Sequence, residues 1–288
     1  METIGETRLC TFLSDGWSSS GVTSEQIRRD SGFIVNSYHE LVRCVAKLAF
    51  FNRDHVLLFR GQRDDKRTSR ERTTLQPSMF RNYVQTGAPE VLRRRYDYLS
   101  SAENLLVEKW RGDNEAESER VARQRILRWA ILQHYEVCPT PLLDVTQSLR
   151  IAASFASLER RRGFVHLFVL AVPQLSGAIT ASAEAGLQIV RLSSICPPSA
   201  LRPHFQEGYL LTEYPEIQDA GAKRQYARYE IDCARRLIAH FQISLDAGFW
   251  SDKNFPRVKK NALYPTSRRD DWLDKLTKSI KDEMGKAP

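Results

Sequence analysis

Arg60 is the residue of this chain best suited, by type and position, to hold an anionic ligand. It directly follows a short apolar run, residues 56–59, which predicts a buried strand. An arginine fixed by packing behind it can bind a phosphate or carboxylate through two parallel hydrogen bonds. Gly61 comes next and allows a sharp turn or a close approach of the backbone to a bound group. A salt bridge at a strand end is the alternative interpretation.

Polar residues also stand at the ends of two other predicted elements. His134 and Tyr135 close a predicted helix, where the imidazole suits a general base or a phosphate donor and the phenol ring suits stacking. Asp144 ends a short predicted strand, residues 142–145, where it can polarise a hydroxyl group or pair with Arg60. For each of them, a buried structural contact is the alternative interpretation.

The hydrophobic pattern indicates the elements that position these side chains. Residues 37–50 have apolar side chains at helical spacing, with Ser37 as the N-cap and Glu40 three residues later. Small residues at helical spacing follow Asp144 and predict a helix that packs closely on a sheet. Strands are predicted at 164–172, 187–192 and 209–212, and an amphipathic helix at 272–284.

Two further segments carry weaker patterns. Residues 63–74 are polar and lack a periodic apolar face, so we expect a mobile loop that can close over a phosphate-bearing ligand or simply lie in solvent. Residues 226–243 mix strand and helix signals. For them we predict a strand followed by a short helix that contains His240.

Composition bounds the class of protein. The chain has 288 residues, 42% of them hydrophobic, and a formal charge of +8 from 43 basic and 35 acidic side chains. This excess suits an anionic partner such as a nucleotide or nucleic acid. The five cysteines are odd in number and dispersed, which favours neither disulfides nor a metal site. Neither a signal peptide nor a membrane-spanning run is evident, so we expect a cytoplasmic protein without membrane contact.

An ordered series of short motifs runs through residues 38–275. It consists of Phe59-Arg60-Gly61-Gln62, Gln133-His134-Tyr135, residues 139–146 (PTPLLDVT), Ser154-Phe155-Ala156, Gln206-Glu207-Gly208 and Tyr264-Pro265. The series resembles the FRG domain family, whose motifs are F-R-G, Q-H-Y-G-x-P-T-R-L-L-D-W-T, F-A, Q-x-G and F-P. The chain departs from that pattern with Glu136 for a glycine, Pro141 for an arginine and Val145 for a tryptophan.

The order of elements is also similar to that of ADP-ribosyltransferases of the R-S-E type. In those enzymes an arginine binds the phosphates of NAD, a serine-rich strand supports the nicotinamide side, and an E-x-E motif precedes a V-L-L-like strand. Aligning the leucines places Gly208 where the catalytic glutamate would stand. The resemblance implies NAD as the ligand, with its phosphates on Arg60, Asp144 and Thr146 lining the site, and Glu207 or Asp144 as the replacement catalytic carboxylate. From their residue types we add His134 as a catalytic candidate and Gly61, Gln62, Tyr135 and Gln206 as cofactor contacts. Gln206 can equally stabilise a turn, and Glu207 is expected to be exposed if Gln206 points inward.

We therefore predict an α+β fold with a mixed, mostly antiparallel central sheet, a helical N-terminal part and an ADP-ribosyltransferase-like cleft. Residues 1–36 are predicted to be a flexible extension and residues 37–282 a single domain. The predicted function is NAD-dependent ADP-ribosyl transfer to nucleic acid or protein, as a toxin or anti-phage effector. A non-catalytic module that binds nucleotides or nucleic acid is the first alternative. A metal-dependent nuclease using Asp144 and Glu207 is the second.

Overall fold

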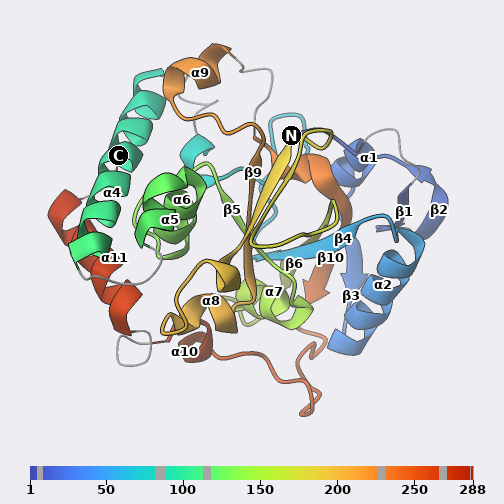
Figure 1. Cartoon of the computed structure of the whole chain (residues 1–288). Coiled ribbons are helices and arrows are strands. Elements are labelled where there is room, and N and C mark those ends of the chain that lie inside the picture. The colour runs from blue at the N-terminus through green and yellow to red at the C-terminus, as the bar shows by residue number, and fades with distance from the viewer. Residues whose placement is uncertain are drawn as a thin grey trace.

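An eight-stranded mixed sheet is the core of this computed structural model (Figure 1). The structure describes residues 1–4, 9–81, 89–112, 118–225, 231–265, 271–285 and 287. The strand order is β3-β10-β6-β4-β5-β9-β8-β7, in which only β3 and β10 pair in parallel. The predicted α+β class with a mostly antiparallel sheet is confirmed.

Strands and helices alternate along the chain, with most of the long helices in its first half. In chain order the elements are β1 (Leu9–Leu13), β2 (Gly16–Val22), α1 (Ser24–Arg29), β3 (Phe33–Val35), α2 (Tyr38–Phe51), β4 (Val56–Gln62), the 3-10 turn η1 (Ser78–Phe80), α4 (Pro89–Gly112), α5 (Ser118–Arg123), α6 (Arg125–His134), β5 (Leu143–Thr146), α7 (Leu149–Ala156), β6 (Phe164–Val172), β7 (Ile179–Ser182), β8 (Leu187–Arg191), η2 (Leu192–Ser194), α8 (Leu201–Phe205), β9 (Gly208–Glu213), α9 (Ala220–Gln225), η4 (Cys233–Arg236), β10 (Leu237–Ser244), α10 (Lys260–Leu263) and α11 (Asp271–Met284).

Helices gather at both ends of the sheet. Figure 1 shows α4, α6 and α11 together at one end, and α2 with the β1–β2 hairpin at the other. Residues 9–36, expected within a flexible extension, instead form β1, β2, α1 and β3. Since β3 pairs with β10, this segment completes one edge of the central sheet. No helix among the described residues is long and apolar enough to cross a bilayer.

Local sequence signals predicted α2 and β6 correctly, but they predicted a helix where the chain forms β10. Ser37 caps α2 by accepting a hydrogen bond from the backbone N of Glu40, as predicted. The predicted helix around His240 is wrong, because this residue lies in β10 opposite Phe168 of β6. Nearly every side chain of β10 is buried, so its sequence lacks the alternation that distinguishes a half-buried strand. Residues 226–230, where the preceding strand was predicted, lie outside the described residues.

The polar loop at residues 63–74 is tied to the protein body. The guanidinium of Arg67 donates to the carbonyl oxygens of Arg29, at 3.3 Å, and Asp30, at 2.6 Å. The backbone N of Thr73 donates to the carbonyl of Arg28 at 2.8 Å. These contacts hold the loop against the end of α1, directly after the strand that carries Arg60.

A buried carboxylate fixes α6, the helix that ends at His134. Glu103 of α4 is 3% exposed and accepts hydrogen bonds from Arg125 Nε, Arg128 Nε and Trp129 Nε1, at 2.9, 3.0 and 2.7 Å. A buried charge is tolerated because charge-assisted hydrogen bonds from these groups satisfy it. This cluster sets the position of α6 relative to the sheet.

Gly61 lies inside β4 rather than in a turn, and its role is to admit α7. A Cβ atom there would stand 1.8 Å from the carbonyl oxygen of Ala152 and 2.9 Å from the backbone N of Ala156. Both are backbone atoms of α7 and have little freedom to move. Gly61 thus allows the close approach of α7 to β4. The small residues of this helix were predicted to pack tightly on a sheet.

Gly61→Ala is expected to lower the free energy of unfolding by about 1–3 kcal/mol or more, because the methyl group overpacks the contact between β4 and α7. Urea unfolding followed by circular dichroism measures this change. Gly112→Ala is the matched control, since a Cβ at Gly112 meets no atom within 4 Å. If both variants unfold at the wild-type urea concentration, the contact between β4 and α7 is not tight.

Candidate functional site

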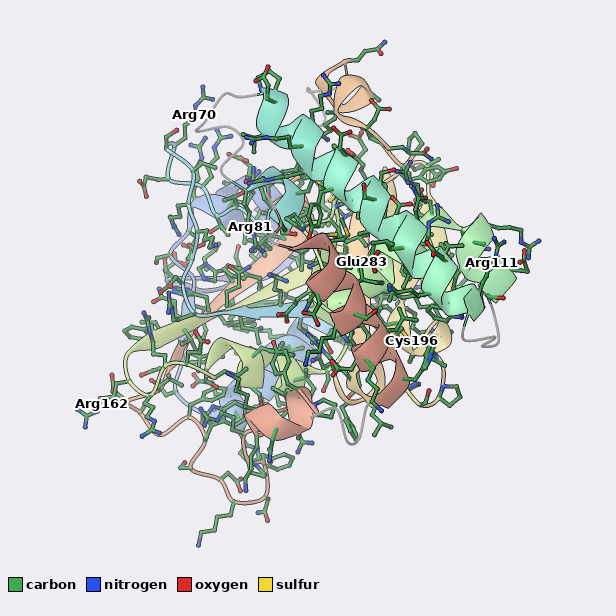
Figure 2. All side chains as sticks on the ribbon, turned by 90° about the vertical axis from the view of Figure 1, so that its left-hand side faces the viewer. Arg70, Arg81, Arg111, Arg162, Cys196 and Glu283 are labelled. Carbon is green, nitrogen blue, oxygen red and sulfur yellow. The ribbon has the colours of Figure 1, made fainter. Side chains whose placement is uncertain are left out.

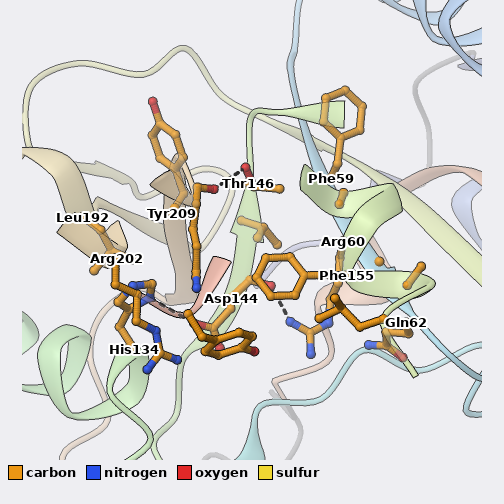
Figure 3. A pocket seen from close by; sticks show the side chains of 18 of the residues that line it. Phe59, Arg60, Gln62, His134, Asp144, Thr146, Phe155, Leu192, Arg202 and Tyr209 are labelled. Atoms are coloured by element: carbon orange, nitrogen blue, oxygen red, sulfur yellow. Dashed lines mark hydrogen bonds and ion pairs between the residues drawn. The ribbon is translucent and has the colours of Figure 1, made fainter. Parts of the chain in front are cut away.

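A cavity of about 350 Å³ lies where β4 and β5 separate (Figure 3). The two strands share one paired position, Phe59 opposite Thr146. On its other edge β4 pairs with β6 along its whole length, residues 56–62, and β5 pairs with β9 on its own other edge. The gap between the diverging strands is open to side chains from both. Of the predicted site residues, the cavity brings together Arg60, Gly61, Gln62, His134, Asp144, Thr146 and Gln206.

Arg60 spans the gap between the separated strands. Its Nη1 donates a hydrogen bond to the backbone carbonyl of Asp144. Its Nε is buried and has no hydrogen-bond partner among the described residues. Burial lowers the pKa of Arg60, and the charge of Asp144 opposes that effect. A charged guanidinium with an unmet donor beside a cavity is suited to an anionic ligand.

Asp144 places an ionised carboxylate in the same cavity. Its side chain is 42% exposed, and its Oδ1 lies 3.9 Å from His134 Nδ1. Burial by itself would raise the pKa of Asp144. The nearby imidazole of His134, the charge of Arg60 and the hydrogen bond from Gln133 outweigh burial and lower that pKa below its usual value. The carboxylate is therefore charged at neutral pH.

Gln133 is a site residue to which its motif alone assigned no role. Its Nε2 donates to Asp144 Oδ2 at 2.7 Å, and its Oε1 accepts from Thr140 Oγ1 at 2.6 Å. The threonine hydroxyl fixes which way the amide points, so Gln133 presents a donor to the carboxylate. The Q-H-Y motif thus supplies two adjacent partners of Asp144 from the end of α6.

Arg202 and Tyr264 form a wall of the cavity that was not predicted. The guanidinium of Arg202 lies 4.7 Å from the centre of the Tyr264 ring and makes a 2.8 Å ion pair with Glu136. Glu136 has φ of 57°, in the left-handed region that favours glycine. The chain therefore has a glutamate in a conformation that favours glycine, and the carboxylate of that glutamate pairs with Arg202. The Arg202 side chain is 12% exposed.

Thr146 and Gln206 join β5 to the segment before β9. The Thr146 hydroxyl donates to the carbonyls of Gln206, at 2.8 Å, and Glu207, at 3.1 Å. Gln206 Nε2 donates to the carbonyl of Leu263 at 2.7 Å. These side chains line the cavity and also hold together the segments that form it.

Tyr135 and Glu207 lie outside the cavity lining. The Tyr135 ring is 2% exposed and packs edge-to-face against His134 at 5.6 Å. Glu207 is exposed and has φ of 45° in the turn that leads into β9. Asp144 and Glu207 therefore do not face a common site. Within the described ranges, no three His, Cys, Asp or Glu side chains gather in a way that could hold a metal ion.

Gly208, at the position aligned with a catalytic glutamate, lines the cavity, and a side chain there would have to displace the end of the Leu192 side chain. A Cβ there would stand 2.8 Å from Leu192 Cδ1 and 3.7 Å from His134 Cε1. Of the predicted catalytic residues, Asp144 is thus the one carboxylate that lines the cavity.

Comparison with known proteins gives one match. The family model of the FRG domain covers residues 55–163, from the start of β4 to the turn after α7. This range includes Arg60, His134, Asp144 and Thr146 and ends before Arg202 and the segments that complete the cavity. No curated protein and no solved structure matches the chain.

Proposed function

Residues 55–163 of this chain belong to the FRG domain family, and from that premise we propose that the protein binds NAD in the cavity and transfers ADP-ribose from it. The observation that carries the proposal is the separation of β4 and β5, with Arg60 across the gap and an ionised Asp144 beside it. The acceptor is a nucleic acid or a protein, and the cellular role is that of a toxin or anti-phage effector.

Two arginines support binding of a dinucleotide with its two phosphates. Arg60 offers a buried Nε that has no partner among the described residues, and Arg202 brings a second guanidinium into the same cavity. Guanidinium groups pair with phosphate oxygens through two parallel hydrogen bonds. The rings of Phe155, Tyr209 and Tyr264 also line the cavity and offer apolar surface for a base or a nicotinamide.

Asp144 supplies the charge that the transfer needs. The bond between ribose and nicotinamide breaks, and nicotinamide leaves with the bonding electron pair. An acceptor atom then bonds to the same ribose carbon and loses its proton to water. Positive charge develops on the ribose as the first bond breaks, and a fixed carboxylate stabilises it. His134 and Gln133 hold Asp144 in its ionised form, so they are positioning residues for this step.

A non-catalytic nucleotide-binding module is the second candidate, and one observation favours it. Gly208 stands where a catalytic glutamate is expected, so this position offers no carboxylate to the cavity that it lines. A site of this kind would hold NAD through the arginines without releasing nicotinamide. No observation favours the nuclease alternative, because Asp144 and Glu207 do not line the same cavity.

Titration calorimetry with NAD, followed by mass spectrometry for free nicotinamide in the presence of cell extract, tests the proposal. Binding with nicotinamide release supports transfer, binding alone favours the module, and absence of both refutes the site.

Arg202→Ala is expected to weaken NAD binding about tenfold, because the variant loses one charge-assisted hydrogen bond to phosphate. Arg43→Ala, an exposed arginine of α2, is the control and should bind as the wild type does.

A further inference from the structure

Basic side chains gather on the surface beside the cavity. Residues 150–164 and 246–263 together carry eight basic and three acidic side chains. The side chains of Arg161, Arg162 and Lys259 are exposed, and none of them makes an ion pair with a described residue. Figure 2 shows Arg162 projecting away from the body of the protein. This surface is therefore strongly positive.

Hydrogen bonds join the two basic segments into one surface. Ser157 accepts from Arg257 Nη1 at its carbonyl, at 2.9 Å, and from Trp250 Nε1 at its hydroxyl, at 3.2 Å. The backbone N of Gly163 donates to Asp246 at 2.9 Å. The loop at residues 251–259 runs along the lower edge of Figure 1, beneath α7 and toward α10. The two segments thus lie side by side next to the rim of the cavity.

The acidic residues of this surface are already engaged. Asp252 lies 2.6 Å from His39 Nε2, and Asp246 accepts from the backbone of Gly163. Glu159 lies 3.9 Å from Arg63. Arg160 pairs with Asp64 at 2.9 Å, whereas Arg161, Arg162 and Lys259 are exposed cations that this surface offers to an external anion.

Aromatic rings accompany the basic residues. Phe255 is 40% exposed, and its ring centre lies 5.1 Å from that of His39 and 5.8 Å from that of Tyr38. Tyr38 in turn stacks on Trp250 at 5.6 Å. Tyr38 is 9% exposed, so Phe255 is the large exposed ring of this cluster. We call Phe255 and the basic residues of the two segments the basic–aromatic surface. Cationic grooves with exposed rings bind single strands, because phosphates pair with the cations and bases stack on the rings.

We propose that the basic–aromatic surface binds single-stranded nucleic acid and that this strand is the ADP-ribose acceptor. The second half of the proposal rests on the proposed transfer from NAD. Continuity with the cavity supports it. Leu158 and Glu159 belong to the first basic segment and line the cavity, and the second segment leads directly into Tyr264 of the cavity wall. A strand on this surface therefore passes the cavity mouth.

Fluorescence anisotropy with a labelled mixed-sequence oligodeoxynucleotide, without NAD, tests the binding step. Arg161→Glu with Arg162→Glu is expected to weaken binding at least about tenfold and to reduce the salt dependence by about one phosphate contact or more. Phe255→Ala is expected to weaken binding about tenfold with unchanged salt dependence, since it removes stacking only. Arg94→Glu with Lys278→Glu, exposed on α4 and α11, makes the same charge change away from the surface.

Three outcomes would overturn the binding proposal. The first is that the wild type does not bind the oligonucleotide. The second is that the control pair weakens binding as much as Arg161→Glu with Arg162→Glu does. The third is that the wild type binds the matching duplex as tightly as the single strand. The acceptor step is then tested by mass spectrometry after NAD is added. An ADP-ribose adduct on the oligonucleotide supports it. Nicotinamide release with adducts on protein alone refutes the acceptor while leaving the proposed function standing, so the two failures are distinguishable.

Discussion

Arg60→Ala is expected to raise the dissociation constant for NAD at least about 100-fold. The substitution removes two charge-assisted hydrogen bonds to phosphate, each contributing about 1.5–3 kcal/mol. Arg60→Lys keeps the charge but loses the planar fork, so an intermediate loss is expected. Calorimetry measures both. In a bacterial host, the wild-type protein is expected to arrest growth. The Arg60→Ala variant, at matched soluble expression, is expected to leave growth unchanged.

The main competing explanation is a purely structural Arg60. Its Nη1 supports the carbonyl of Asp144, so loss of the side chain could disturb the gap between β4 and β5. Thermal unfolding separates the two roles, because a binding role predicts folded protein with weak NAD affinity. Arg53→Ala removes an exposed arginine just before β4 and should leave binding unchanged. Wild-type NAD affinity in Arg60→Ala would show that Arg60 is structural only.

Much of the framework follows from local sequence. The strand ending near Arg60, the capped helix after Ser37 and the strand at Phe164–Val172 all appear where hydrophobic spacing and capping predicted them. Each depends on neighbours within a few residues, so its signal survives in the sequence alone. The motif residues Gln133, His134 and Asp144 also meet, because a short connection leads from α6 to β5.

The remaining features depend on contacts between distant segments. Arg202 and Tyr264 meet across the cavity although neither stands in a pattern that links it to the other. The parallel pairing of β3 with β10 joins the two ends of the chain, and no local signal marks it. The surroundings of Gly61 likewise could not be predicted from local sequence. Its type indicated a close approach, but the partner, a carbonyl of α7, is known only from the fold.

Asp144→Asn is expected to lower the rate of nicotinamide release about 100- to 1000-fold while changing the affinity for NAD less than about threefold. Asparagine keeps the shape and can still accept from Gln133, but it lacks the charge that stabilises the ribose cation. The lowered pKa of Asp144 adds a second expectation. Its carboxylate loses charge only below the usual aspartate range near pH 4, so it imposes no loss of rate in mild acid.

Single-turnover assays and calorimetry on the same samples separate the effect on rate from that on binding. Asp97→Asn, an exposed residue of α4 whose side chain is 73% exposed, is the matched control and should release nicotinamide at the wild-type rate. If Asp144→Asn retains the full rate, the transfer does not depend on this carboxylate. If both rate and binding are lost in a folded protein, Asp144 shapes the cavity rather than stabilising the transition state, because a charge that acts only there leaves NAD affinity intact.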